Sequence, residues 1–157
     1  MRLEEKKEYQ LVADRQRLLA VLEDKLIDYN FSSSNKMDLV FFEDATQHIL
    51  RILRILMQPR GNAMLIGLSG SGKQSLTKFA ASILEHDSFQ VKLSKNFKPA
   101  DFRETLKEKM LIAGTQQKST TFVLNDTQIM HECFLEDVNN ILNTGEITNL
   151  YTKEDMD

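Results

Sequence analysis

The stretch "AMLIGLSGSGKQSLTKF", residues 63–79, decides the fold expected of this chain. It joins a short apolar run, a glycine-rich loop and the start of an amphipathic helix. A short apolar run before such a loop is typical of a strand buried on both faces of a parallel sheet. Gly67, four residues, Gly72 and Lys73 match the first seven positions of the phosphate-binding pattern G-x-x-x-x-G-K-[ST]. The stretch therefore predicts an α/β domain that binds a nucleotide.

The loop itself supplies the predicted binding residues. Glycines let the backbone curl so that successive amides point at the phosphates, and the following helix adds its positive N-terminal end. Lys73 is expected to reach the β and γ phosphates. The dinucleotide pattern G-x-G-x-x-G is not met, because Ser75 stands where its third glycine belongs. The predicted nucleotide-binding residues are Gly67, Leu68, Ser69, Gly70, Ser71, Gly72, Lys73, Gln74 and Ser75.

Gln74 departs from the pattern, which places a Ser or Thr hydroxyl there as a ligand of Mg²⁺. An amide oxygen on a longer, more flexible arm can bind a hard cation only at a greater ordering cost. Ser75 is a poor substitute, because the next residue of a helix points about 100° further around the axis. The sequence therefore predicts weakened magnesium binding.

A second apolar run, "TTFVLND", ends in Asp126. After a phosphate loop, this arrangement predicts a Walker B strand over 121–126 whose carboxylate holds Mg²⁺ directly or through water. A strand-ending Asp is also a common helix N-cap, but the upstream loop favours the metal role. Thr127 follows, and a threonine cannot act as the base that orients an attacking water. We therefore predict Asp126 as the metal ligand and no catalytic residue.

The rest of the chain predicts alternating strands and helices. Helices are expected over 3–29, 42–56, 99–114 and 129–143, and a further strand over 88–93. Pro59 and Gly61 should end the second helix, and Gly114 and Gly145 the last two. The inward-facing residues are expected to be Leu11, Leu18, Leu22 and Leu26; Phe42, Ala45, Ile49, Ile52, Leu53 and Leu56; Phe102, Leu106 and Met110; and Leu135, Val138 and Leu142.

Three features together are more specific than a phosphate loop: "QPRGNA" before the strand, "GSGKQSLT" with Gln after the lysine, and "NDTQI" followed by "FLEDVNNILNTGEI". With them, most of residues 24–151 resembles the fourth AAA+ module of an axonemal dynein heavy chain. That resemblance implies a microtubule motor with a ring of six AAA+ modules. In it the first module does most of the ATP hydrolysis, the fourth is regulatory, Gly67 to Gln74 hold the nucleotide and Asp126 is the Walker B acid.

The resemblance implies a P-loop NTPase of AAA+ type, a three-layer αβα fold with an incomplete parallel sheet and N-terminal helices. We expect an N-terminal helical segment at 1–30, a linker at 31–37 and a partial AAA+ large subdomain at 38–157, with the phosphate loop at 67–74. AAA+ sheets are ordered 5-1-4-3-2, and the fourth strand, the sensor residues and the helical lid have no counterpart in the sequence. We therefore expect a piece of a heavy chain or a shortened product, with an open slot beside the strand at 63–67.

The functional expectation is a regulatory module that binds ATP or ADP without hydrolysing it. Its partners would be the remaining AAA+ modules and, through the parent protein, other dynein chains and microtubules, in the cytoplasm, the cytoskeleton and the axoneme of a cilium. A free-standing P-loop NTPase or phosphotransferase and a structural fragment with a vestigial loop remain as alternatives. A net charge of −3 gives no case for nucleic acid, and no apolar run suits a signal peptide or membrane span. Cys133, the only cysteine, allows no intrachain disulfide.

Overall fold

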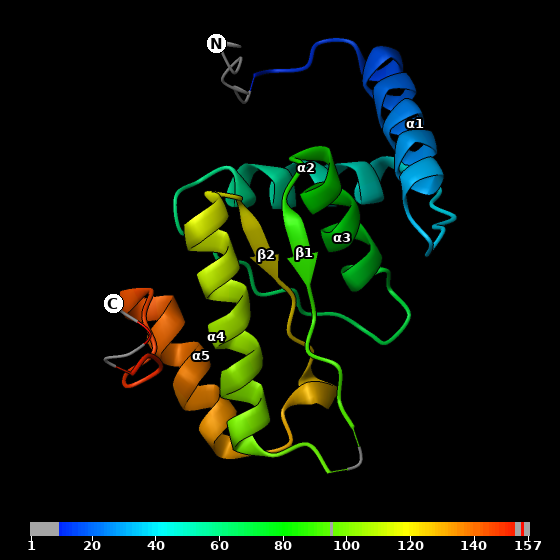
Figure 1. Ribbon diagram of the computed structural model, residues 1–157. Helices are drawn as coiled ribbons and strands as arrows, with labels where there is room; N and C mark the ends of the chain where they lie inside the picture. Colours follow the sequence, from blue (N-terminus) through cyan, green and yellow to red (C-terminus); the bar gives the residue numbers. More distant parts are fainter. Residues whose placement is uncertain (1–9, 95, 153–154, 156–157) are drawn as a thin grey trace.

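The computed structural model describes residues 10–94, 96–152 and 155 and places them in a mixed α/β arrangement (Figure 1). The parts of the predicted terminal segments at 1–9, 153–154 and 156–157 lie outside the described residues. The elements are α1 (Arg15–Ser32), α2 (Glu43–Leu56), α3 (Lys73–Ile83), β1 (Asp87–Phe89), α4 (Pro99–Gln116), β2 (Thr120–Phe122), the 3₁₀ helix η1 (Asp126–Gln128) and α5 (Glu132–Thr144). None of the described helices is long and apolar enough to cross a membrane.

The sheet consists of β1 and β2, which run parallel with Ser88 opposite Thr121. The amide of Val123 extends the ladder by one bond, 2.9 Å long, to the carbonyl of Phe89. Parallel neighbours need a crossover, and α4 provides it. The predicted order of strand, helix and strand is therefore confirmed for this part of the chain, although each strand has only three residues.

The predicted strand at 63–67 is wrong. Residues 61–68 have no regular secondary structure, and the sheet of β1 and β2 does not include them. A strand is stable only when its backbone groups pair with a neighbour. Without one, the apolar side chains meant for the interior face solvent: Met64 is 89% exposed and Ile66 is 88% exposed.

One hydrophobic cluster joins α1, α2 and α3. Its fully buried centre is Ile49 of α2 and Phe79 of α3, and Leu22 of α1 packs with them. The apolar spacing of α2 is thus confirmed, except that Phe42 is 60% exposed because it is the N-cap of the helix. Leu11 is also not inward-facing: it is 97% exposed and precedes α1, whose N-cap is Asp14.

The segment after α1 is fixed by its own hydrogen bonds. The helix runs on to Ser32, two residues into the predicted linker. Beyond it, the side-chain amide of Asn30 accepts a bond from the amide of Met37 at 2.7 Å and donates one to the carbonyl of Met37 at 2.8 Å. This Asn bridge holds the chain where it turns from α1 towards α2.

A second hydrophobic cluster joins β1, β2, α4 and α5 around Phe102 and Phe134, whose stacked rings lie 4.2 Å apart. Phe102 and Leu106 are buried as predicted, but α4 continues past Gly114 to Gln116 and ends with Gln117 in a left-handed conformation at φ 51°.

The predicted inward face of α5 is confirmed at Val138, which packs against the second hydrophobic cluster, and wrong at Leu135 and Leu142. Leu135 and Leu142 are about half exposed, at 49% and 50%, whereas Phe134 and Asp137 are buried. The carboxylate of Asp137 turns inward because it accepts three bonds from Arg103 of α4, 2.6 Å, 2.9 Å and 3.2 Å long. Hydrogen bonding to Asp137 also raises the pKa of Arg103 above its ordinary value. A buried carboxylate needs such a partner, and this ion pair sets how α5 lies on α4.

Candidate phosphate-binding site

The glycine-rich loop is built around two left-handed residues. Gly70 and Gly72 both have φ 78°, and Gly72 is the N-cap of α3. The amide of Ser71 closes the turn on the carbonyl of Leu68 at 3.3 Å. Left-handed backbone costs residues with a Cβ about 1 kcal/mol or more, so these glycines are what allows the chain to curl directly into a helix. The loop thus brings free amides and a helix N-terminus together, which is the arrangement an anion needs.

Lys73, the first residue of α3, points back into this loop. Its ammonium donates hydrogen bonds to the carbonyls of Gly67 at 2.7 Å and Leu68 at 2.6 Å, and to the hydroxyl of Ser71 at 3.2 Å. The cation therefore already lies where the phosphates are predicted to bind. Phosphate oxygens would be stronger acceptors for it than neutral carbonyls, because both partners would then carry charge.

The residues with a hydroxyl after Gln74 do not replace the magnesium ligand that the pattern expects at this position. Gln74 is exposed and Ser75 is half-buried. Thr77 is buried, and its hydroxyl donates to the carbonyl of Lys73 at 2.8 Å, inside the helix. The structure therefore offers an exposed amide, and no hydroxyl, at the position where the pattern expects a magnesium ligand.

Asp126 starts the 3₁₀ helix η1 beyond the carboxyl end of β2. Its side chain is exposed, and one carboxylate oxygen accepts the amide of Thr127 at 2.9 Å. The predicted Walker B strand is thus shorter than 121–126, but it does deliver Asp126 to the end of the sheet. The other carboxylate oxygen is available to a cation.

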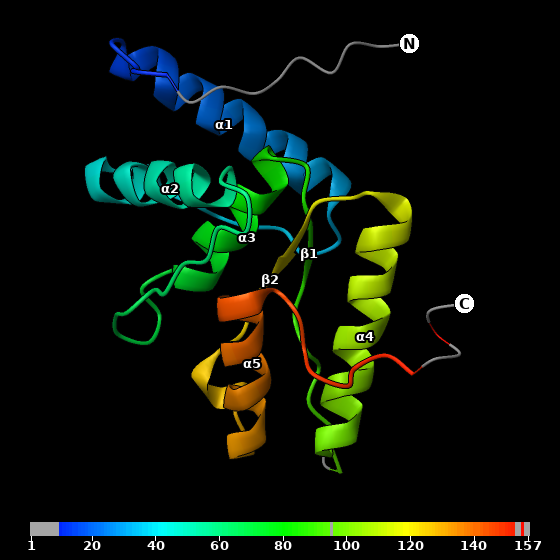
Figure 2. The same cartoon turned by 90° about the vertical axis from the view of Figure 1, so that its left-hand side faces the viewer.

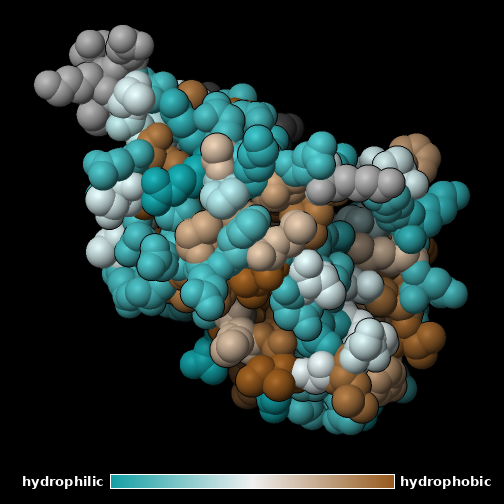
Figure 3. Space-filling view, turned by 90° about the horizontal axis from the view of Figure 1, so that it is seen from below, coloured by the Kyte–Doolittle hydropathy of each residue, from teal (hydrophilic) through white to brown (hydrophobic). Residues whose placement is uncertain are grey.

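The loop and Asp126 lie at the same end of the molecule. In Figures 1 and 2, the first turn of α3 and the carboxyl ends of β1 and β2 all point towards the lower end, with η1 below the strands. Figure 3 views this end and shows apolar side chains interspersed with polar ones over its surface. No group of three or more His, Cys, Asp or Glu able to hold a metal occurs among the described residues, so Asp126 is not part of such a group.

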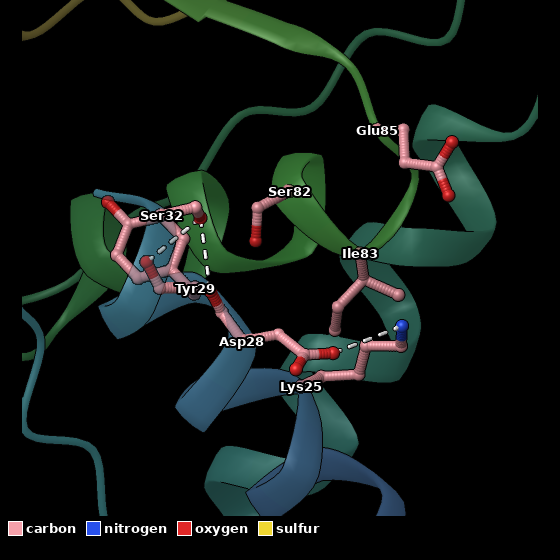
Figure 4. A pocket seen from close by; sticks show the side chains of 7 residues that line it. All are labelled: Lys25, Asp28, Tyr29, Ser32, Ser82, Ile83 and Glu85. Atoms are coloured by element: carbon pink, nitrogen blue, oxygen red, sulfur yellow. Dashed lines mark hydrogen bonds and ion pairs between the residues drawn. The ribbon is translucent and has the colours of Figure 1, made fainter.

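A separate cavity of about 200 Å³ lies at the opposite end of α3 (Figure 4). On its α1 side, Lys25 and Asp28 form an ion pair of 3.7 Å, and the hydroxyl of Ser32 bonds to the carbonyl of Asp28 at 3.0 Å. Its lining is Lys25, Asp28, Tyr29, Ser32, Ser82, Ile83 and Glu85. The C-terminal end of a helix carries a negative partial charge, and two of the lining residues are acidic. This cavity is therefore unsuited to phosphate.

Gln128 is the residue that the sequence interpretation missed. It is only 6% exposed, and its side-chain oxygen accepts the amide of Asn125 at 2.8 Å and the side chain of Gln90 at 3.2 Å. Its side-chain nitrogen donates to the carbonyl of Val91. Apolar periodicity gives no signal for a buried amide. The only hint was its place two residues after the predicted metal ligand.

The sequence of this chain is similar to those of known proteins. Residues 37–157 match the family described as the P-loop containing dynein motor region D4. Human dynein axonemal heavy chain 1 is 45% identical over 151 residues, 96% of this chain and 4% of that relative. Human dynein axonemal heavy chain 2 is 44% identical over 156 residues, 99% of this chain and 4% of the relative. The dynein-1-beta heavy chain of the flagellar inner arm I1 complex of Chlamydomonas reinhardtii is 46% identical over 149 residues, 94% of this chain and 3% of that relative.

Proposed function

Because this chain belongs to the family of the P-loop containing dynein motor region D4, we propose that it is a regulatory module that binds ATP or ADP and does not hydrolyse it alone. The observation that carries the proposal is the loop itself. Left-handed Gly70 and Gly72 lead straight into α3, and the ammonium of Lys73 lies inside the curl. The loop therefore favours a negatively charged group, because its amides, the N-terminus of α3 and the ammonium of Lys73 all lie around the same point.

In the proposed complex, the backbone of residues 67–75 holds the phosphates, and Lys73 exchanges its carbonyl acceptors for phosphate oxygens. Asp126 and the amide of Gln74 are the groups that would hold Mg²⁺. The donor set fits a weak site, since one carboxylate and one exposed amide leave most of the octahedral positions of the ion to water and phosphate.

Isothermal titration calorimetry with ATP and ADP, each with and without Mg²⁺, tests the proposal. A free-standing NTPase or phosphotransferase would instead turn over substrate in a manner dependent on Lys73. A structural module with a vestigial loop would bind no nucleotide at any magnesium concentration, and that result would contradict the proposal.

Gln74→Thr should tighten the binding of Mg·ATP by about 5-fold and leave metal-free ATP nearly unchanged. A threonine hydroxyl restores the ligand that the pattern expects, and one added polar contact contributes on the order of 1 kcal/mol. The two titrations of the same variant control for each other. An equal response with and without the metal would mean that position 74 has no bearing on Mg²⁺.

Phosphate release by the purified chain should equal that of a Lys73→Ala control. Hydrolysis needs a positioned metal, a group that orients water and a cation that stabilises the developing charge. Gln74 weakens the first, Thr127 cannot supply the second, and the assay contains no neighbouring module to give the third. Thr127→Glu alone should therefore not create turnover. Steady release above the control, abolished by Asp126→Ala, would place this chain among the enzymes.

The chain spans about 4% of the length of the heavy chains that it matches. We propose that within a parent of that kind its partners are the remaining AAA+ modules of the ring, with microtubules and other dynein chains reached through the motor, in the axoneme of a cilium. The proposed complete architecture is the three-layer αβα fold. In it β1 and β2 would be neighbouring strands, and the exposed segment at 61–68 would gain the partner that it lacks here.

A further inference from the structure

Gln128 connects the two strands beyond the point where the sheet ends. The last ladder bond runs from the amide of Val123 to the carbonyl of Phe89. Beyond this bond, the side chain of Gln128 connects the two segments that continue the strands. Its oxygen accepts a hydrogen bond from the amide of Asn125, and its nitrogen donates one to the carbonyl of Val91. No buried side-chain polar atom among the described residues lacks a partner, so both polar atoms of this buried amide are paired.

The turn that Gln128 closes is the one that carries Asp126. The amide of Gln128 bonds back to the carbonyl of Asn125 at 3.0 Å, and the amide of Ile129 to the carbonyl of Asp126 at 3.1 Å. Asp126 therefore follows directly after Asn125, which Gln128 holds through both its side chain and its backbone. Its own carboxylate is exposed and bonds only locally, to the amide of Thr127, so it has little means of fixing its own place.

The other end of the connection leads to the phosphate loop. Val91 follows β1, β1 contacts α3, and α3 begins at Lys73 in the loop. Val91 is 3% exposed and packs in the second hydrophobic cluster, so its carbonyl is a firm anchor. A side chain that bonds to this anchor and to the Asp126 turn sets the position of the carboxylate relative to the loop.

We infer that Gln128 is a positioning residue that holds Asp126 in place for a magnesium ion on the bound nucleotide. The metal part of this inference rests on the proposed function. The alternative is that Gln128 serves only the packing of the interior. In that case the Asp126 turn would keep its shape when the side-chain amide is replaced by an apolar side chain of similar length.

Gln128→Met makes that replacement, and Gln116→Met, at an exposed glutamine on the last residue of α4, is the matched control. The first readout is amide hydrogen exchange by NMR at Thr127 and Ile129, whose bonds go to Asp126 and not to Gln128. Exchange at both should rise at least about 10-fold in Gln128→Met and stay unchanged in the control, because opening of the turn is measured directly by exchange. Unchanged exchange in Gln128→Met would overturn the inference.

The second readout is calorimetric titration of ATP with and without Mg²⁺. Gln128→Met should lose the part of the affinity that depends on the metal while keeping the metal-free affinity within about 2-fold. Faster exchange with an unaltered magnesium dependence would overturn the metal role. If the unsubstituted chain binds no nucleotide, the proposed function fails, and the metal role fails with it. The exchange result would still decide whether Gln128 holds the turn.

Gln128→Glu covers the case in which the apolar variant does not fold. A carboxylate keeps the acceptor for the amide of Asn125 and removes the donor to the carbonyl of Val91. Exchange at Thr127 should therefore rise above that of the unsubstituted chain at the same pH. Unchanged exchange, or loss of folding in both variants, would overturn the inference, because Gln128 would then serve the fold alone.

Discussion

Lys73→Ala is expected to weaken ATP binding by roughly 10 to 150 fold. A charge-assisted contact to phosphate contributes on the order of 1.5 to 3 kcal/mol, and every 1.4 kcal/mol is about tenfold in affinity. The geometry supports the upper part of this range, because the ammonium already lies within the loop, bonded to Gly67, Leu68 and Ser71. Little ordering is needed before it meets the ligand. Isothermal titration calorimetry at fixed ionic strength measures the ratio.

The matched control is Lys78→Ala, which removes the same charge from the same helix five residues further along. Screening limits what a charge outside the loop can do, so this variant should stay within about 2-fold of the parent. Thermal unfolding without nucleotide checks that both variants fold. Both variants should unfold near the parent temperature, since the loop and its lysine bonds are exposed. Equal ATP affinity in the parent and Lys73→Ala would rule out the loop as a phosphate site.

The parts that sequence predicted correctly are those decided locally. The spacing of Ile49, Ile52 and Leu53 allows only one buried face for α2, and that face forms the first cluster. The glycine-rich loop is equally local: it was predicted to curl, and Gly70 and Gly72 adopt the left-handed conformation that lets it do so. The helix that begins at Lys73 and the strand that precedes Asp126 were predicted from equally local patterns.

The errors concern features that depend on distant partners. The apolar run at 63–67 has the composition of a strand, but pairing is a property of two segments, and the described structure gives it no second one. On α5, Leu135 and Leu142 were predicted to face inward, whereas the buried positions include Asp137. Its partner Arg103 lies 34 positions earlier, and no periodicity reveals a buried ion pair at that separation. Gln128 escaped notice in the same way, since its acceptor Val91 is 37 positions away.

Gly61→Ala is expected to destabilise the fold by about 2 to 3 kcal/mol, the upper part of the range typical of overpacking. A Cβ on Gly61 would lie 1.9 Å from the carbonyl oxygen of Ile55 and 3.1 Å from that of Gln58. Both are backbone atoms of the exit from α2, where the amide of Gly61 bonds to the carbonyl of Gln58 at 3.0 Å. Arg60, beside it, has φ 56° and reaches the carbonyl of Asn143 at 3.5 Å. An added methyl must therefore open a turn that also contacts α5.

Gly114→Ala is the control for that substitution, because a Cβ there meets nothing within 4 Å and the residue lies in α4. Alanine lowers the entropy cost of a helical position, so this variant should gain about 0.5 to 1 kcal/mol. In a chain of this size 1 kcal/mol shifts the melting temperature by about 2 to 4 °C. Differential scanning calorimetry should thus show Gly61→Ala melting roughly 4 to 12 °C below the parent and Gly114→Ala slightly above it. A Gly61→Ala variant that melts with the parent would mean that the chain leaves α2 by a looser path than this turn, and that Arg60 is not held against α5.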